Sequence, residues 1–171
     1  TAGARDVVLT TSAGSDTETG GFTYTALPVV GTLSPASGPA SGGTAVTIPG
    51  SNFTGATKVT FAGTNAESFE VIDSSTIRAI TPAGTAGAAT VEVTTPSGAS
   101  FTDGTFTYVA APTLSDISPT QVPAGETTTG VVLTGTNLAT ATAVTIGGQN
   151  APITAGPSAT SVTITAPNLA A

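Results

Sequence analysis

The fold is decided by residues 42–53, which read GGTAVTIPGSNF. Val46 and Ile48 alternate with threonine, as in a β-strand with one buried and one solvated face. The following Pro49-Gly50-Ser51-Asn52 is rich in turn-forming residues. Short alternating segments and turns of this kind recur through residues 28–111, and no segment has a helical period. We therefore predict an all-β fold, a sandwich of two antiparallel sheets.

The alternation also predicts which side chains form the core of this sandwich. Each strand contributes one or two apolar residues at every second position, and these should point inward. The predicted core residues are Val46, Ile48, Val59, Phe61, Phe69, Val91, Val93, Phe106 and Tyr108.

The chain contains an internal repeat. Phe22-Thr23-Tyr24 recurs 84 residues later as Phe106-Thr107-Tyr108, and after one inserted residue Gly50–Phe53 matches Gly135–Leu138. A period of this length is that of a small domain. We expect one complete repeat at residues 28–111, the C-terminal hairpin of a preceding or complementing repeat at 1–27, and the N-terminal strands of a further repeat at 112–171.

Several motifs of the complete repeat resemble those of the IPT/TIG family of immunoglobulin-like domains. They are Ser34-Pro35, Gly42–Ile48, Gly50–Phe53 and the closing Phe106–Tyr108. The third repeat departs from the pattern, with Thr127–Thr129 where the second has Gly42–Thr44. The resemblance implies tandem immunoglobulin-like modules, common in bacterial extracellular proteins as spacers or binding units. It implies no catalytic site.

Composition excludes several classes of function. The 171 residues include no His, Cys, Met or Trp, so imidazole or thiolate catalysis and disulfides are impossible. Three basic residues against ten acidic ones leave a net charge of −7, which disfavours nucleic acid as a partner. No apolar run is long enough to span a membrane, so we expect no membrane insertion. We predict no cofactor and no enzymatic activity.

The densest acidic cluster consists of Glu67, Glu70 and Asp73. Paired carboxylates can hydrolyse glycosides, but Glu70 lies between the inward-facing Phe69 and Val71 and should therefore face water. A calcium site built from Asp73 or Asp103 would need a denser acidic loop, so we predict no metal site.

Three other positions have a functional and a structural interpretation. Lys58 alternates with inward-facing neighbours and should be exposed, which makes a crosslink through its amine improbable. Asn52-Phe53-Thr54 matches a glycosylation sequence, but the equivalent Asn137 lacks the hydroxyl residue, which favours a turn position with positive φ. Tyr24 and Tyr108 end strands at domain joints and could seal the sandwich or stack on a sugar.

The terminal segments complement each other. The expected hairpin of residues 1–27, with strands at Val7–Thr11 and Phe22–Thr25, carries the apolar residues Val7, Leu9, Phe22 and Tyr24. It resembles the last two strands of a repeat, whereas residues 112–171 supply the earlier strands. Two explanations remain open: a chain cut from a covalent array of repeats, or a hairpin that completes the sandwich of a neighbouring copy.

The leading functional hypothesis is a structural module of an extracellular or cell-surface stalk, fibre, filament or surface layer of a bacterium, or of a virion. Its partners would be neighbouring copies of itself or adjacent repeats of the same polypeptide. The alternative is an adhesin module that binds a carbohydrate or a host receptor, which would need exposed aromatic side chains. An enzyme is the third and weakest hypothesis.

Overall fold

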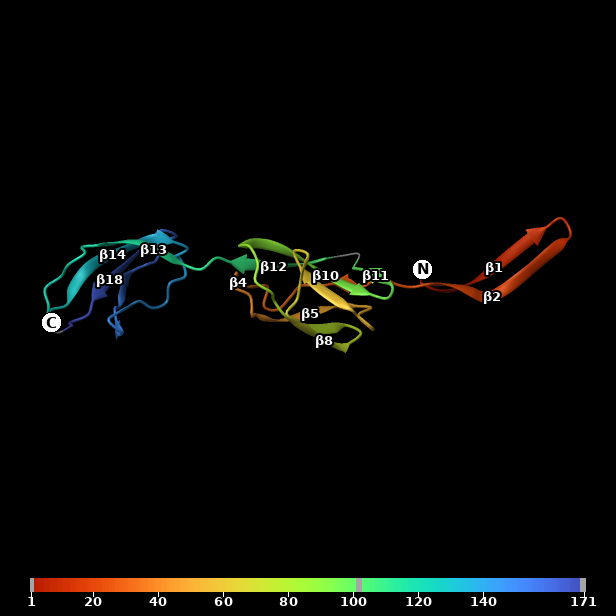
Figure 1. The fold of residues 1–171 in the computed structure, drawn as a ribbon, viewed down its shortest axis with the longest axis horizontal. Coiled ribbons are helices and arrows are strands. Elements are labelled where there is room, and N and C mark those ends of the chain that lie inside the picture. Colours follow the sequence, from red (N-terminus) through yellow and green to blue (C-terminus); the bar gives the residue numbers. More distant parts are fainter. Residues whose placement is uncertain (1, 101–102, 170–171) are drawn as a thin grey trace. The chain divides into compact units, whose positions relative to one another are not determined.

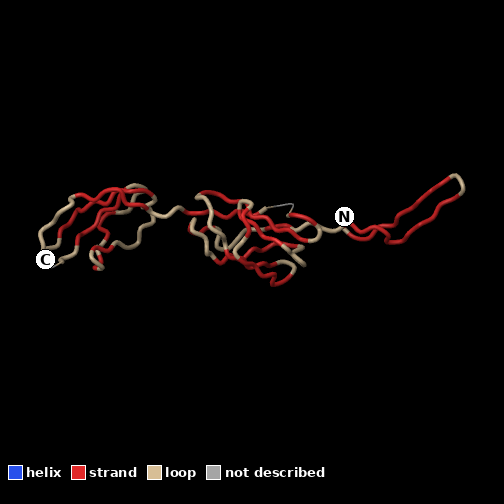
Figure 2. The backbone as a smooth tube through the Cα atoms, in the orientation of Figure 1, coloured by secondary structure: helices blue, strands red, loops and turns tan. Residues whose placement is uncertain are grey.

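The computed structural model describes residues 2–100 and 103–169. All the regular structure in these residues is β-strand, and they contain no helix (Figure 2). The all-β prediction is therefore confirmed. The chain divides into two compact units, Thr1–Val109 and Ala110–Ala171.

Unit 1 begins with a two-stranded antiparallel hairpin of β1 (Gly3–Thr11) and β2 (Gly14–Tyr24), coloured red in Figure 1. Both strands are longer than the sequence indicated, because pairing extends through polar residues such as Ser15–Glu18 that carry no apolar alternation. A two-stranded sheet buries neither face, so Ser, Thr and Asp side chains can occupy it without being desolvated. The apolar side chains of the hairpin are exposed.

The rest of unit 1 is a sandwich of two sheets. One sheet has the strand order β3-β5-β9-β8, and the other has β4-β12-β10-β6-β7 with β11 paired to β10. All pairs are antiparallel except β4 with β12, which run parallel. The strands are β3 (Val29–Val30), β4 (Ser37–Pro39), β5 (Ala45–Ser51), β6 (Lys58–Phe61), β7 (Thr64–Asn65), β8 (Ser68–Asp73), β9 (Thr76–Ile80), β10 (Gly87–Thr95), β11 (Gly98–Ala99) and β12 (Gly104–Val109).

The core of this sandwich lies between the two sheets. Eight of the nine predicted core residues are buried there, and Phe69 is half-buried against the same cluster. Three aromatic rings meet in its centre: Phe106 packs edge-to-face on Phe61, with ring centroids 5.7 Å apart, and on Tyr108, with centroids 5.1 Å apart. The other members of this apolar cluster, which were not predicted as core, are Val30, Leu33, Phe53, Ile77, Ala79 and Ala89.

Unit 2 contains a four-stranded sheet with the order β13-β14-β18-β17 and a separate pair, β15-β16. The buried cluster is smaller than that of unit 1 and is centred on Val131, Leu133, Val162 and Ile164. The strands are β13 (Thr113–Ser118), β14 (Thr128–Thr136), β15 (Thr145–Ile146), β16 (Gln149–Asn150), β17 (Ile153–Ala155) and β18 (Ser161–Ala166).

The residue inserted in the last repeat is Gly130. The pairing of β14 with β18 shifts between Thr129 and Val131, and Gly130 has a φ of 77°, as at a β-bulge. Before this bulge the displacement between repeats is 84, so Thr128, paired with Ala166, corresponds to Thr44. This corrects the alignment expected from the sequence, since residues 126–127 replace the two glycines at 42–43.

Candidate binding and assembly surfaces

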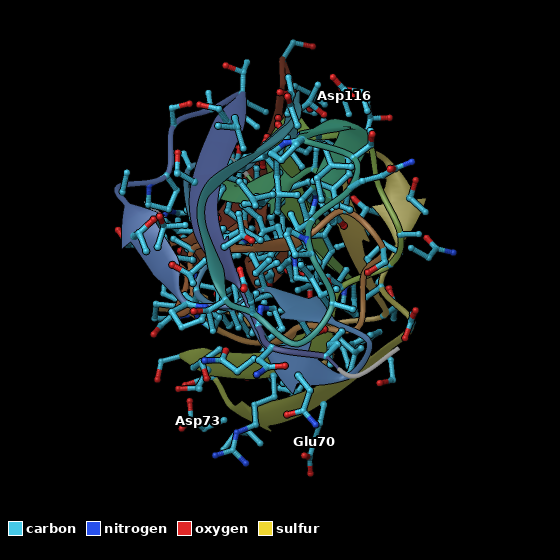
Figure 3. The ribbon with its side chains drawn as sticks, turned by 90° about the vertical axis from the view of Figure 1, so that its left-hand side faces the viewer. Glu70, Asp73 and Asp116 are labelled. Atoms are coloured by element: carbon cyan, nitrogen blue, oxygen red, sulfur yellow. The ribbon has the colours of Figure 1, made fainter. Side chains whose placement is uncertain are left out.

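The acidic cluster is a solvated edge of the sandwich. Figure 3 shows Glu70 and Asp73 pointing outward from β8, and Glu67 is also exposed. Asp73 Oδ1 accepts hydrogen bonds from the backbone N–H and the hydroxyl of Ser75, both at 2.7 Å. These bonds, the hydroxyl first, lower the pKa of Asp73 below its ordinary value of 3.8. A carboxylate held ionised in this way is suited to closing a turn and not to donating a proton.

The residues considered for calcium do not come together. Asp103 accepts a hydrogen bond from the hydroxyl of Ser100 at 2.6 Å, on a different strand connection from that of Asp73. Within residues 2–100 and 103–169, no group of three or more acidic side chains is placed to hold a metal ion.

Each of the two equivalent asparagines bonds to the residue that precedes its own repeat, and we call this contact a joint. Asn52 and Asn137 have φ angles of 60° and 58°, which confirms the predicted turn role. The Asn52 side-chain amide donates to the carbonyl of Leu27 at 2.9 Å, and that of Asn137 donates to the carbonyl of Ala111 at 3.1 Å. These two bonds were not predicted from the sequence. The recurrence of asparagine at the same turn of both repeats was the signal that could have indicated them.

Lys58 and the two tyrosines occupy different environments. Lys58 is exposed at the start of β6, as expected. Tyr108 is buried, and its hydroxyl donates to the carbonyl of Pro82 at 2.8 Å, so it seals the sandwich. Burial raises its pKa above 10.0, with a smaller contribution from the charge of Glu67. Tyr24 is exposed instead.

The β1–β2 hairpin presents an exposed apolar surface. Val7, Leu9, Phe22 and Tyr24, the four predicted assembly residues, are all exposed. The rings of Phe22 and Tyr24 lie edge-to-face with centroids 5.1 Å apart. Exposed aromatic rings are typical of surfaces that bind either a protein or a sugar.

Unit 2 contains an open apolar cleft with a volume of about 300 Å³. The residues that line it include Ile117, Val122, Val131, Ile146, Pro167 and Leu169. Leu114 is also exposed in this unit, on β13. The cleft therefore offers a second apolar surface for contact with a partner.

In the described ranges, 2–100 and 103–169, no helix is long and apolar enough to cross a membrane.

Some solved structures are similar in part to this chain. The full extracellular region of plexin A4, domains 1 to 10, is 24% identical over 99% of this chain and 15% of its own length, with a TM-score of 0.46. SGBP-B from a complex xyloglucan utilization locus in Bacteroides uniformis is 20% identical over 83% of this chain and 43% of its own, with a TM-score of 0.42. SGBP-B of the Bacteroides ovatus mixed-linkage glucan utilization locus, in complex with a mixed-linkage heptasaccharide, is 22% identical over 78% and 34%, with a TM-score of 0.35.

This chain thus spans less than half the length of these three proteins. Among curated proteins we found no match. The family model of the IPT/TIG domain matches residues 28–108 and 112–171, which together make up most of the chain. The described residues form mainly antiparallel sheets without helices, in agreement with the immunoglobulin-like fold of that family. The chain therefore belongs to the IPT/TIG domain family.

Proposed function

We propose that this chain is a non-catalytic structural module of an extracellular assembly in which IPT/TIG repeats follow one another as spacers. The observation that carries the proposal is the repeated joint. Asn52 and Asn137 adopt the same left-handed backbone conformation, and each donates to the carbonyl of the residue that precedes its own repeat, Leu27 and Ala111 respectively. Each repeat therefore restrains the chain that enters it, as a spacer requires.

The chemistry of the side chains supports a structural role. The whole chain lacks His and Cys, the residues most used for proton transfer and for thiol chemistry. The densest carboxylate cluster lies on an exposed edge, and Asp73 in that cluster is already bonded to Ser75. A purified chain with reproducible hydrolase turnover would contradict the non-catalytic assignment.

A double variant tests the spacer role. Replacing Asn52 and Asn137 with alanine removes both joint hydrogen bonds, so limited proteolysis near Leu27 and Ala111 should accelerate. A matched control replaces the exposed Asn65 and Asn150, which lie at equivalent positions of the two repeats on β7 and β16. Equal cleavage of the variant, the control and the parent chain would show that the joints are not held, and would refute the spacer proposal.

The runner-up function is a binding module for a carbohydrate or a host receptor. The exposed edge-to-face pair Phe22 and Tyr24 is the observation in its favour, because aromatic faces bind sugars. A glycan array would detect such binding. Signals that disappear in the F22A/Y24A variant would favour this function, and an array without signals would remove it.

A further inference from the structure

The β1–β2 hairpin shares the backbone pairing of the last strands of unit 1 at both of its ends, and differs between them, where Val7 pairs with Glu18 but Val91 pairs with Gly104. Its residue pairs match, 84 residues later, those of β10 with β12 near one end and of β10 with β11 at the other. The matching pairs are Gly3↔Tyr24 with Gly87↔Tyr108, Arg5↔Phe22 with Ala89↔Phe106, and Thr11↔Gly14 with Thr95↔Gly98. The ring pairs agree as well, with interplanar angles of 73° and 77° at the same separation of 5.1 Å.

The two strand pairs differ in burial. Phe22 and Tyr24 are 54% and 56% exposed, whereas Phe106 and Tyr108 are 0% and 3% exposed. The same holds for Val7 and Leu9, whose counterparts Val91 and Val93 are fully buried. The hairpin thus carries the apolar residues of a core-forming strand pair, and in the described residues these side chains are exposed.

Unit 2 exposes two apolar side chains whose counterparts in unit 1 are covered. Leu114 is 64% exposed and Ile117 is 36% exposed, whereas their counterparts Val30 and Leu33 are both only 3% exposed. In unit 1 these two side chains pack over Gly104 of β12, where an added Cβ would lie 2.7 Å from Val30 Cγ1 and would overlap Leu33. Gly20 stands at the equivalent position of the hairpin and also lacks a side chain, but it has a φ of 67° and lies in the register shift between Arg5 and Val7, whereas Gly104 pairs with Val91.

The cleft of unit 2 corresponds to the place that Tyr108 fills in unit 1. Tyr108 bonds to the carbonyl of Pro82, and its ring lies against Gly84 so closely that a Cβ there would overlap it. The counterparts of Pro82 and Gly84 are Pro167 and Leu169, and both line the cleft. Because Leu169 carries a side chain where unit 1 has Gly84, an aromatic ring can enter the cleft beside Pro167 only in a position shifted from that of Tyr108.

A free strand edge completes the acceptor surface. In unit 1, β6 pairs with β7 on one side and with β10 on the other, whereas the equivalent β15 pairs with β16 alone among the described strands. The pairs Val91↔Phe61 and Val93↔Val59 of unit 1 predict Val7↔Ile146 and Leu9↔Val144 for a docked hairpin. Strand addition to such an edge satisfies the backbone and buries alternate side chains.

The hairpin departs from the pattern at one inward position, because Arg5 stands where unit 1 has Ala89. Ala89 borders an open hollow of about 610 Å³. An arginine at this rim can bury its aliphatic part and keep its guanidinium in solvent.

We propose that unit 2 binds the β1–β2 hairpin of a second copy of this chain, with Phe22 and Tyr24 filling the cleft beside Pro167 and with β1 added to the edge of β15. The inference rests on the proposed function, because it supplies the contact by which spacer repeats would join. The contact is heterologous, so each copy offers a hairpin to one neighbour and a cleft to another. It produces an open head-to-tail chain unless the copies close into a ring.

Engineered cysteines test the register directly, because the chain has none of its own. Val8 and Thr145 should face each other across β1 and β15, as Glu92 and Thr60 do in unit 1. Directly paired residues lie at a Cα separation that a disulfide can bridge. The V8C and T145C chains are mixed under mild oxidation, and heterodimer is measured by intact mass. The control mixture replaces T145C with S158C, on the exposed loop before β18.

We expect about tenfold more heterodimer than in the control mixture, because docking raises the local concentration of the facing thiols. The excess should disappear when V8C also carries F22S and Y24S, two exposed positions, and should persist with I72S, an exposed apolar residue of β8. Equal yields of heterodimer in both mixtures would overturn the proposal. A single chain that carries both V8C and T145C would also overturn it if its disulfide formed only within the chain and not between copies. Slow proteolysis at the asparagine joints together with equal crosslinking would retain the spacer function and reject the hairpin exchange.

Discussion

Replacing Phe106 with alanine is the sharpest test of the core of unit 1. The ring is fully buried, contacts Phe61 and Tyr108 edge-to-face, and comes so close to Gly38 that a Cβ there would lie 3.0 Å from its Cζ. Truncating a buried Phe costs about 3–5 kcal/mol. Because the walls of the resulting cavity belong to two hydrogen-bonded sheets that cannot collapse into it, we expect the upper part of this range, about 4–5 kcal/mol.

Urea unfolding measures this loss. The chain has two tyrosines and no tryptophan, so in a Y24F background the fluorescence reports Tyr108 alone. With a slope of about 1 kcal/mol per M for a small domain, the midpoint should fall by about 4 M or the domain should be unfolded in buffer. Phe106→Leu, which keeps most of the volume, should cost about 1–2 kcal/mol and keeps the test quantitative if alanine prevents folding.

The matched control is Phe22→Ala, the same residue in the repeated motif but more than half exposed. It should change the unfolding free energy of unit 1 by no more than about 0.5 kcal/mol. A cost below about 1 kcal/mol for Phe106→Ala, or equal costs for the two alanine variants, would refute the assignment of Phe106 to a rigid core.

Three further predictions concern single residues of unit 1, and urea midpoints followed by circular dichroism measure each. Asn52→Ala removes the bond to Leu27 and leaves a residue with a Cβ but no side-chain amide at a φ of 60°, so it should cost about 1–2 kcal/mol of unfolding free energy. Asn52→Gly should cost less, because glycine adopts this φ without strain. Equal costs for the two variants would argue against backbone strain at this position. Ala62 has a φ of 48° in the turn between β6 and β7, where unit 2 has Gly147, and Ala62→Gly should stabilise by about 0.5–1 kcal/mol; a destabilised variant would contradict this. Burial raises the pKa of Tyr108 above 10.0, so its contribution to stability is complete below that pH and is lost as pH rises through the folded-state pKa. Tyr108→Phe should flatten the decline in stability above about pH 10, and an unchanged decline would assign it to other groups.

Apolar alternation predicts which face of a strand points inward better than it predicts how deeply each side chain on that face is buried. Val46, Val91 and Phe106 are almost completely buried, as central positions of two facing sheets should be. Phe69 follows the same alternation but is only half-buried, because β8 is the edge strand of its sheet and has a neighbour on one side only. Alternation does not distinguish an edge strand from a central one.

The joints were harder to predict, because they depend on contacts between residues far apart in sequence. The turn preference of Asn52 is local and can be inferred from its type. Its bond to Leu27 spans 25 residues and requires the strand order of the sandwich to be known. The position of the inserted residue could not be predicted for the same reason. Only the register of β14 against β18 identifies Gly130 as the bulge.

The energetics of the proposed hairpin exchange limit how tightly two copies can associate. About half of each apolar side chain involved is still exposed, namely Val7, Leu9, Phe22, Tyr24, Leu114, Ile117 and Val122. Covering them would contribute on the order of 5–10 kcal/mol before costs. Each new backbone hydrogen bond along β15 adds about 1 kcal/mol, whereas association itself costs about 4–15 kcal/mol.

Gains and costs of similar size predict micromolar or weaker binding between free copies. Light scattering should therefore show a molecular mass that increases with concentration up to about 1 mM and stays constant for the F22S/Y24S chain. A mass that stays at that of the monomer throughout this range would mean that the cleft is filled by some other segment. An array that links many repeats raises the effective concentration of each hairpin near its cleft, so weak pairwise contacts are enough to order it.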